Sequence, residues 1–274
     1  MAERKQQKGE KQQAEKQQAG QQQAGQQSAG QQQGDSQSLK GRKVAILATD
    51  GFEQVELTEP RKALDAAGAQ TRVVSPKADK IRGWNLTDWG DEVKVDLQLD
   101  QARPEDFDAL LLPGGVMNPD KLRMNGKAVE FVAAFFDAGK PVAAICHGPW
   151  TIIEADAADG RRIAAWPSLK TDLRNAGAEW VDEEACVDGN LVSARKPDDI
   201  PAFNREMLAL FARSPEEIAG AREGAEEVVA MYVHLEAWPN REDEVLELLQ
   251  GSPELFAQAP VIERRSYARQ PAGQ

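Results

Sequence analysis

Cys146 and His147 stand side by side at the end of a short apolar run, "PVAAICHGP", in which a glycine and a proline turn the chain directly afterwards. A thiol beside an imidazole can supply a nucleophile and its base. The segment "AICHG" has the small-x-nucleophile-x-Gly form of a nucleophile elbow, with Ala144 where the first glycine usually stands. The positive end of a helix that begins after the elbow favours the thiolate. The pattern therefore predicts that Cys146 is a reactive nucleophile rather than a small apolar core residue.

Few other residues could support a different chemistry. The chain has two cysteines, Cys146 and Cys186, and two histidines, His147 and His234, and none of their spacings is typical of a metal site. The "LPGG" segment lacks the Lys-Ser/Thr continuation of a phosphate-binding loop. We expect no cofactor and no metal, and two free thiols, because no disulfide framework of a small secreted protein is visible.

The elements that must position Cys146 alternate between strands and helices. Apolar runs predict buried strands at 43–49, 71–76, 107–115 and 141–146, and helical spacing predicts helices at 56–68, 127–140 and 198–213. A hairpin over 179–195 is expected to turn at Asp188-Gly189-Asn190. Strands that alternate with helices predict an α/β fold, namely a flavodoxin-like three-layer sandwich with a mostly parallel sheet.

In such sheets, ligands gather at the carboxyl ends of the strands. Cys146 and the Gly114-Gly115 turn both follow predicted strands. They are therefore neighbours if their strands are neighbours in the sheet. Trp84, Trp89, Trp166 and Trp180 are expected in the core or at its rim, with an aromatic substrate shelf around Trp84 and Trp89 as the alternative.

Composition divides the chain into three parts. The chain has 274 residues, is 41% hydrophobic and carries a net charge of −12, which suits one ordinary core and a small second unit. Residues 1–38 form a Gln-rich repeat that we expect to be a disordered tail. Residues 40–213 form the predicted α/β domain. Residues 215–274 read as a small β-α-β extension, weakly similar to half of a ferredoxin-like domain and suited to an edge or dimer contact.

Charge and hydropathy limit the partners. The acidic balance disfavours nucleic acid and anionic membranes as general partners. No run of about 18 apolar residues predicts a membrane span, and the N-terminus lacks the apolar core of a signal peptide. We expect a cytoplasmic protein that acts on small solutes or proteins.

Five motifs in order resemble the PfpI family of the DJ-one/PfpI superfamily, whose members include intracellular peptidases, protein deglycases and glyoxalase-like stress proteins. The resemblance covers residues 43–212 and rests on "ATDGFEQVELTEP", "FDALLLPGGVMNPDKLRMN", "GKPVAAICHGP", "LKTDLRNAGAEWVDEE" and "DGNLVSARKPDDIPAFNREML". It implies the flavodoxin-like fold that is shared with class I glutamine amidotransferases. It also implies that Cys146 is the nucleophile, with His147 as its imidazole partner.

The resemblance implies roles for two carboxyl groups. Glu56 matches the family glutamate that hydrogen-bonds the cysteine sulfur, and such a carboxyl would stay protonated because two adjacent anions repel. Glu53 is the nearby alternative, and for either residue a carboxylate at a helix start is the simpler interpretation. The backbone N–H groups of Gly115 and His147 would form the oxyanion hole.

Asp120 falls where some family members place an acid that orients the catalytic histidine of a neighbouring subunit. That role would make the active site a property of a homodimer or a higher oligomer. An exposed aspartate in the first turn of its helix is the alternative.

Taken together, these features predict a cysteine-dependent hydrolase for carbonyl adducts, of the deglycase or glyoxalase type, acting on small carbonyl compounds or glycated proteins. Two alternatives keep Cys146 at the centre, an intracellular cysteine peptidase and a redox-sensing or chaperone-like protein. A glutamine amidotransferase that uses His234 and Glu236 is a further alternative. It is disfavoured because His234 lies beyond the last helix of the predicted domain.

Overall fold

A central sheet of seven strands runs through residues 38–220, the part of the chain that the computed structural model describes. In spatial order the strands are β11 (Cys186–Asp188), β12 (Leu191–Ala194), β8 (Val142–Ile145), β7 (Ala109–Leu112), β1 (Lys43–Leu47), β3 (Gln70–Ser75) and β6 (Leu97–Gln98). Every neighbouring pair is parallel except β11 and β12, which form an antiparallel hairpin around the predicted turn at 188–190. The prediction of a mostly parallel sheet is confirmed.

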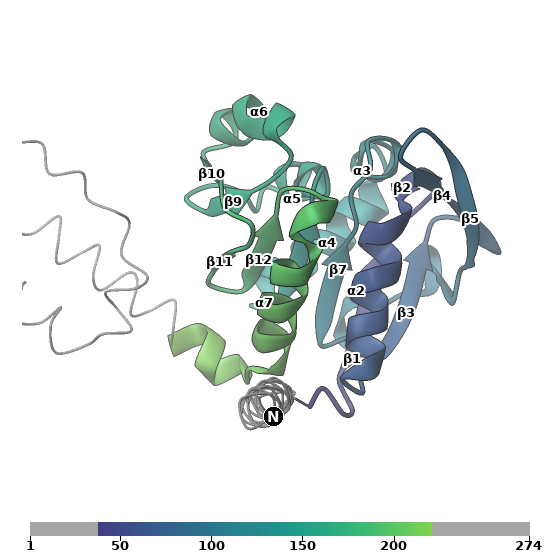
Figure 1. Cartoon of the computed structure of the whole chain (residues 1–274). Coiled ribbons are helices and arrows are strands. Elements are labelled where there is room, and N and C mark those ends of the chain that lie inside the picture. The colour runs from purple at the N-terminus through teal and green to yellow at the C-terminus, as the bar shows by residue number, and fades with distance from the viewer. Residues whose placement is uncertain (1–37, 221–274) are drawn as a thin grey trace, which may run out of the picture.

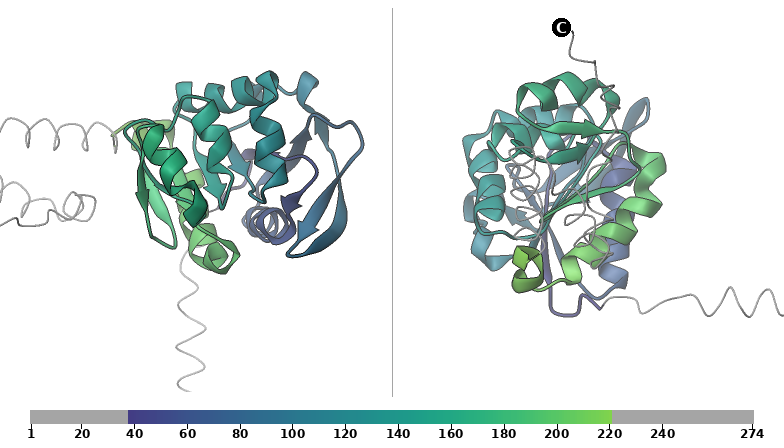
Figure 2. Two further views of the ribbon diagram at one scale, coloured as in Figure 1. Left: turned by 90° about the horizontal axis from the view of Figure 1, so that it is seen from above. Right: turned by 90° about the vertical axis from the view of Figure 1, so that its left-hand side faces the viewer.

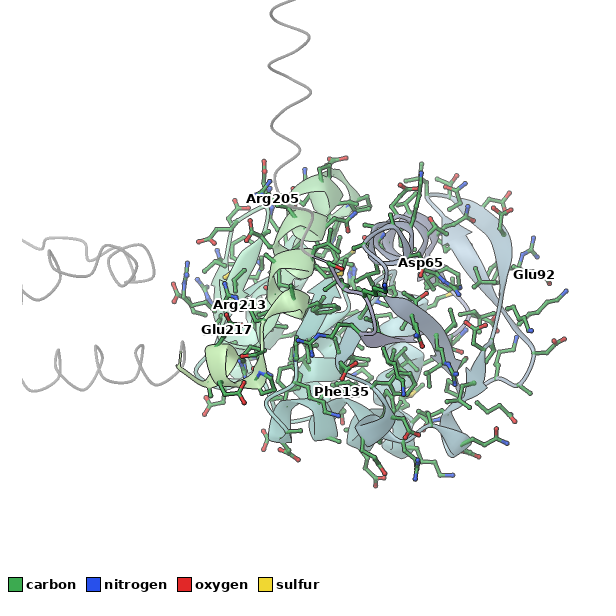
Figure 3. The ribbon with its side chains drawn as sticks, turned by 90° about the horizontal axis from the view of Figure 1, so that it is seen from below. Asp65, Glu92, Phe135, Arg205, Arg213 and Glu217 are labelled. Carbon is green, nitrogen blue, oxygen red and sulfur yellow. The ribbon has the colours of Figure 1, made fainter. Side chains whose placement is uncertain are left out.

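Helices cover both faces of this sheet (Figure 1). One face carries α2 (Gln54–Ala66) and α7 (Ile200–Ala212), and the other carries α3 (Met117–Arg123), α4 (Gly126–Asp137) and α5 (Pro149–Glu154). The edge-on view in the right panel of Figure 2 shows the three layers. In the view from below, Asp65 on α2 and Arg205 on α7 lie across the sheet from Phe135 on α4 (Figure 3). This is the flavodoxin-like sandwich that the sequence predicts.

The strands are apolar on both faces because both faces are covered. In β1, Val44 and Ile46 belong to the core beneath α2 and α7, whereas Ala45 and Leu47 belong to the core beneath α4 and α5. All four side chains are buried. A strand that buries both faces reads as a continuous apolar run, which is why these runs stand out in the sequence.

Two small sheets lie beside the central one. The first joins β2 (Phe52–Glu53) to the hairpin of β4 (Lys80–Asn85) and β5 (Asp88–Lys94). The second pairs β9 (Arg162–Ala164) with β10 (Glu179–Val181), near α6 (Lys170–Asn175). The predicted hairpin over 179–195 is therefore too long, because residues 179–181 pair with β9 instead. The remaining elements are short 3-10 helices, η1 (Leu99–Gln101), η2 (Pro104–Asp106), η3 (Pro167–Leu169) and η4 (Pro197–Asp199).

The ends of the described region pack onto the sandwich. Leu39 is buried and its N–H donates to the Ala67 carbonyl over 2.9 Å. Residues 215–220 are helical, and Ile218 packs in the core beside α7. No helix within 38–220 is long and apolar enough to cross a membrane. The predicted tail and nearly all of the predicted C-terminal extension lie outside the described residues.

Candidate active site

The loops after β7 and β8 bring the predicted oxyanion turn and the predicted nucleophile together. These strands are parallel neighbours, with Leu112 opposite Ala144, so the Gly114-Gly115 turn and Cys146 follow at the same edge of the sheet. The next strand, β1, leads through a short loop to α2, which carries Glu56. From β1 the chain reaches β3 on one side and later β7 on the other. The site therefore lies at the switch point where α/β sheets bind ligands.

Cys146 occupies a strained turn. Its φ angle is +62°, a left-handed conformation that a residue other than glycine adopts at a cost of about 1 to 3 kcal/mol. Two backbone bonds fix it, since its N–H donates to the Ala194 carbonyl over 2.9 Å and its carbonyl accepts from the Trp166 N–H over 3.0 Å. Gly148 completes the turn, because a Cβ there would lie 2.6 Å from the Leu112 carbonyl oxygen. A strained turn of this kind is what a nucleophile elbow at Cys146 would require.

His147 lies against the thiol and is held on three sides. Its Nδ1 is 3.2 Å from Cys146 Sγ, and its Nε2 is 3.4 Å from Ser168 Oγ. The Trp166 ring stacks on the imidazole with centroids 5.9 Å apart, and the Trp150 ring meets it edge-on at 5.0 Å. Burial lowers the pKa of His147 to about 4, so the ring is neutral at pH 7. A neutral imidazole at this distance can accept the thiol proton.

Glu56 is fully buried in the first turn of α2 and lies beside Cys146. Its Oε2 accepts a hydrogen bond from the Gly114 N–H over 3.0 Å. Burial raises the pKa of Glu56 to about 8. The hydrogen bond from the Cys146 thiol lowers this pKa, whereas the nearby Glu53 carboxylate raises it further. The carboxyl is therefore mostly protonated at pH 7, as the family resemblance implies for this position. A Cβ on Gly114 would lie 2.6 Å from Glu56 Oε2 and 2.7 Å from Cys146 Cβ, so only glycine fits between them.

Glu53 precedes α2 and is nearly buried. Burial raises the pKa of its carboxyl, against a hydrogen bond from the Leu86 backbone N–H. Its charge raises the pKa of Glu56, so the two carboxyl groups lie in one cluster. Glu56, and not Glu53, forms the hydrogen bond with Cys146. The structure thus brings both glutamates to the site and places Glu56 against the thiol.

The electrostatics of Cys146 differ from the sequence-based expectation. Burial raises the pKa of the thiol strongly, and the Glu56 charge adds to this. The backbone N–H groups of Gly115 and His147 point at the sulfur and act in the opposite direction. The helix that follows, α5, spans only six residues and does not outweigh burial. The resting group is therefore a thiol whose proton must leave when the sulfur attacks.

Asp120 is an exposed residue in the first turn of α3. It forms no contact with His147 within residues 38–220, where the imidazole contacts are those with Cys146, Ser168, Trp150 and Trp166. A role for Asp120 at a histidine would therefore require a second copy of the chain.

Sequence reasoning missed the residues that support the site. Asn118 is fully buried, and its side chain accepts from the Thr49 N–H over 2.7 Å and donates to the Pro113 carbonyl over 2.8 Å. It therefore ties the loop after β7 to the end of β1. Ser168 lies 21 residues after His147 and contacts its Nε2, whereas Trp150 lies on α5, directly after the turn, and meets the imidazole edge-on. No local pattern marks Asn118 or Ser168, because each acts through a contact that only the fold creates.

The remaining sequence expectations concern other groups. Cys146 and Cys186 are both free, as expected, and both are buried. His234 and Glu236, the residues of the amidotransferase alternative, lie outside the described region. After β12, where that alternative needs a histidine, Arg195 instead forms an ion pair with buried Asp199 at 2.9 Å. Among residues 38–220, no three His, Cys, Asp or Glu side chains gather as a metal site would require.

Several known proteins are similar to this chain. General stress protein 18 of Bacillus subtilis is 46% identical over 175 residues, which are 63% of this chain and 99% of that protein. Protein/nucleic acid deglycase 2 of Escherichia coli is 44% identical over 173 residues, covering 62% of this chain and 98% of the relative. YraA of Bacillus subtilis, which carries a provisional cysteine-protease name, is 44% identical over 171 residues, again covering 62% and 98%.

A solved structure and a family model agree with these relatives. A two-domain protein from Anabaena variabilis with DJ-1/ThiJ/PfpI-like and ferritin-like domains superposes with a TM-score of 0.58 and 36% identity, over 61% of this chain and 49% of that one. The model of the DJ-1/PfpI family matches residues 42–210, the region that contains the sandwich and every group of the site. The chain belongs to the DJ-1/PfpI family.

Proposed function

We propose that this protein is a cysteine-dependent hydrolase of the deglycase or glyoxalase type, acting on small carbonyl compounds and on carbonyl adducts of proteins. The observation that carries the proposal is the placement of four polar groups around one sulfur. The Cys146 thiol lies against the imidazole of His147, the carboxyl of Glu56 and two inward-facing backbone N–H groups. The similarity to protein/nucleic acid deglycase 2 supports this choice.

The first step of the proposed reaction is addition of the sulfur to an aldehyde carbon. His147 Nδ1 accepts the thiol proton as the S–C bond forms. Charge develops on the former carbonyl oxygen, and the N–H groups of Gly115 and His147 stabilise it. Neutral Glu56 can donate a hydrogen bond while the sulfur carries charge, and the imidazole then returns the proton to the oxyanion.

The later steps need no external oxidant or reductant. With a 2-oxoaldehyde, a proton moves from the thiohemiacetal carbon to the adjacent ketone carbon. The former aldehyde carbon becomes the carbonyl carbon of a thioester, and the ketone is reduced to an alcohol by the same shift. Water then cleaves the thioester, releasing a 2-hydroxy acid and restoring the thiol. Glu56 and His147 are the groups beside the sulfur that can carry these protons.

The test is a panel of substrates given to the full chain and to its Cys146→Ala variant. We expect methylglyoxal consumption with lactate formation, and release of amine from a methylglyoxal adduct of a model amine, both lost in the variant. Consumption that persists in Cys146→Ala, or lactate that never appears with the wild-type chain, would refute the proposal.

A cysteine peptidase is the second candidate because of the similarity to YraA. The same thiol, imidazole and N–H groups could attack a peptide carbonyl, with the second subunit of an oligomer lending Asp120. Casein included in the same panel separates the two functions, since a peptidase cleaves casein without consuming methylglyoxal. The redox-sensor alternative is less well supported, because oxidation follows thiolate character and burial raises the pKa of Cys146.

A further inference from the structure

Exposed apolar side chains concentrate near the candidate active site. Residues 38–220 contain five large apolar residues with strong exposure, and three of them adjoin the groups of the site. These are Leu86, Val116 and Trp166, with exposed fractions of 76%, 57% and 38%, and we call them the apolar rim. The other two are Trp89 and Met124.

Each residue of the apolar rim bonds to, adjoins or stacks on a different group around the sulfur. The backbone N–H of Leu86 donates to the Glu53 carboxyl. Val116 directly follows Gly115, whose N–H faces the Cys146 sulfur. Trp166 stacks on His147, and its own N–H donates to the Cys146 carbonyl. The three residues lie on three separate loops, those after β7 and β9 and the turn between β4 and β5, and each loop contacts or contributes a group of the site.

The turn that carries Leu86 is held in place although it is exposed. Leu86 has a φ angle of +57°, which is unfavourable for a bulky residue. The Trp84 indole N–H donates to the Leu86 carbonyl over 2.9 Å, and Trp84 packs edge-on against Trp89 at 5.5 Å. The guanidinium of Arg82 lies 5.7 Å from the Trp89 ring centroid. These contacts hold the backbone of the turn, in which the Leu86 N–H faces the Glu53 carboxyl.

The polar groups of the site favour an uncharged substrate. The interactions of Cys146 and His147 are with backbone N–H groups, with each other, with Glu56 and with neutral side chains. A substrate carboxylate would lack a cationic partner among these contacts. An apolar substituent, in contrast, would bind favourably, because contact with the apolar rim removes its surface from water.

We propose that the apolar rim makes the site selective for 2-oxoaldehydes whose second carbonyl carries an apolar substituent, such as an aryl group. The inference rests on the proposed function, which supplies the reaction at Cys146. The rim adds to it a preference among substrates. The side chains of Leu86 and Val116 set this preference without touching the reacting sulfur.

The first test compares two substrates. The ratio of kcat/KM for phenylglyoxal to that for methylglyoxal is measured for the wild-type chain, Leu86→Ala and Val116→Ala. We expect each variant to lower the ratio about fivefold, because each removes apolar contact area from the phenyl group only. Met124→Ala is the matched control, since Met124 is as exposed as Leu86 but lies at the far end of α3, and its ratio should not change.

The second test does not depend on turnover. The rate of Cys146 alkylation by N-benzyliodoacetamide is divided by the rate with iodoacetamide, and we expect this ratio to fall about fivefold in Leu86→Ala and Val116→Ala alone. If the alkylation ratio falls in these two variants while the wild-type chain consumes no glyoxal, the proposed function is wrong and the selectivity of the apolar rim is supported. If both ratios are unchanged, the proposal is overturned. Unchanged ratios with weaker self-association would show that a second copy covers the rim.

Discussion

At the scale of residues, the site is a set of ionisable groups that burial has made neutral. Glu56 and His147 have pKa values moved in opposite directions, to about 8 and about 4, and burial is the main cause for both. Each is therefore uncharged at pH 7. Neutral groups beside a neutral thiol can exchange one proton without placing an isolated charge in a buried site.

The shifted pKa of Glu56 predicts how stability depends on pH. Because the folded-state pKa lies above the unfolded value of 4.5, the folded chain holds a proton that the unfolded chain releases between these two values. The Glu56 contribution is thus fully present below the unfolded-state pKa of 4.5 and is lost as the pH rises through about 8. Glu56→Gln lacks this effect, so its free energy of unfolding relative to wild type should increase by about 1.4 kcal/mol per pH unit across that window.

Urea unfolding of wild type and Glu56→Gln at several pH values from 5 to 8 measures this difference. Glu59→Gln on the exposed face of the same helix is the control, and its difference from wild type should stay constant. A constant difference for Glu56→Gln would mean that the carboxyl is already ionised in the folded chain.

At the scale of elements, the turn after β8 makes the site by forcing Cys146 into a left-handed conformation. Gly148→Ala should destabilise the chain by about 2 kcal/mol and lower turnover, because the added Cβ meets the Leu112 carbonyl, which belongs to β7 and cannot move freely. Gly126→Ala is the matched control, since a Cβ at the start of α4 meets no atom within 4 Å. Thermal melting and activity assays should show a loss in the first variant only; equal behaviour of the two would contradict the tight packing of the turn.

The same scale shows what the sequence can and cannot predict. The strands β1, β7 and β8 are recognisable because continuous apolar runs follow from burial on both faces. The hairpin of β4 and β5 is not, because its residues are mostly exposed and lack an apolar alternation. Cys146, His147 and Glu56 can be found from motifs, whereas Asn118 and Ser168 can be found only after folding brings them to the site. The helix start after Cys146 predicts a lowered thiol pKa, whereas burial, which no local pattern shows, raises it.

At the scale of the whole molecule, we propose that a second copy of the chain completes the site. Asp120 is exposed and is a proposed partner for the histidine of a neighbouring copy. If so, Asp120→Asn should lower turnover about tenfold, equivalent to about 1.4 kcal/mol of transition-state stabilisation, and wild-type activity should fall on dilution together with oligomer mass. Asp137→Asn, an exposed change at the end of α4, should have no effect. A fully active monomer by light scattering would leave Asp120 as a surface residue.

The central claim is that one thiol of the whole chain performs the chemistry, and the two cysteines allow a direct comparison. Both are buried and free, but only Cys146 lies against an imidazole and Glu56. The decisive measurement is the rate of lactate formation from methylglyoxal by wild type, Cys146→Ser and Cys186→Ser, with circular dichroism to confirm that each is folded. The account predicts that Cys146→Ser falls to the uncatalysed rate while Cys186→Ser keeps the wild-type rate. Lactate formation by folded Cys146→Ser at the wild-type rate would contradict it.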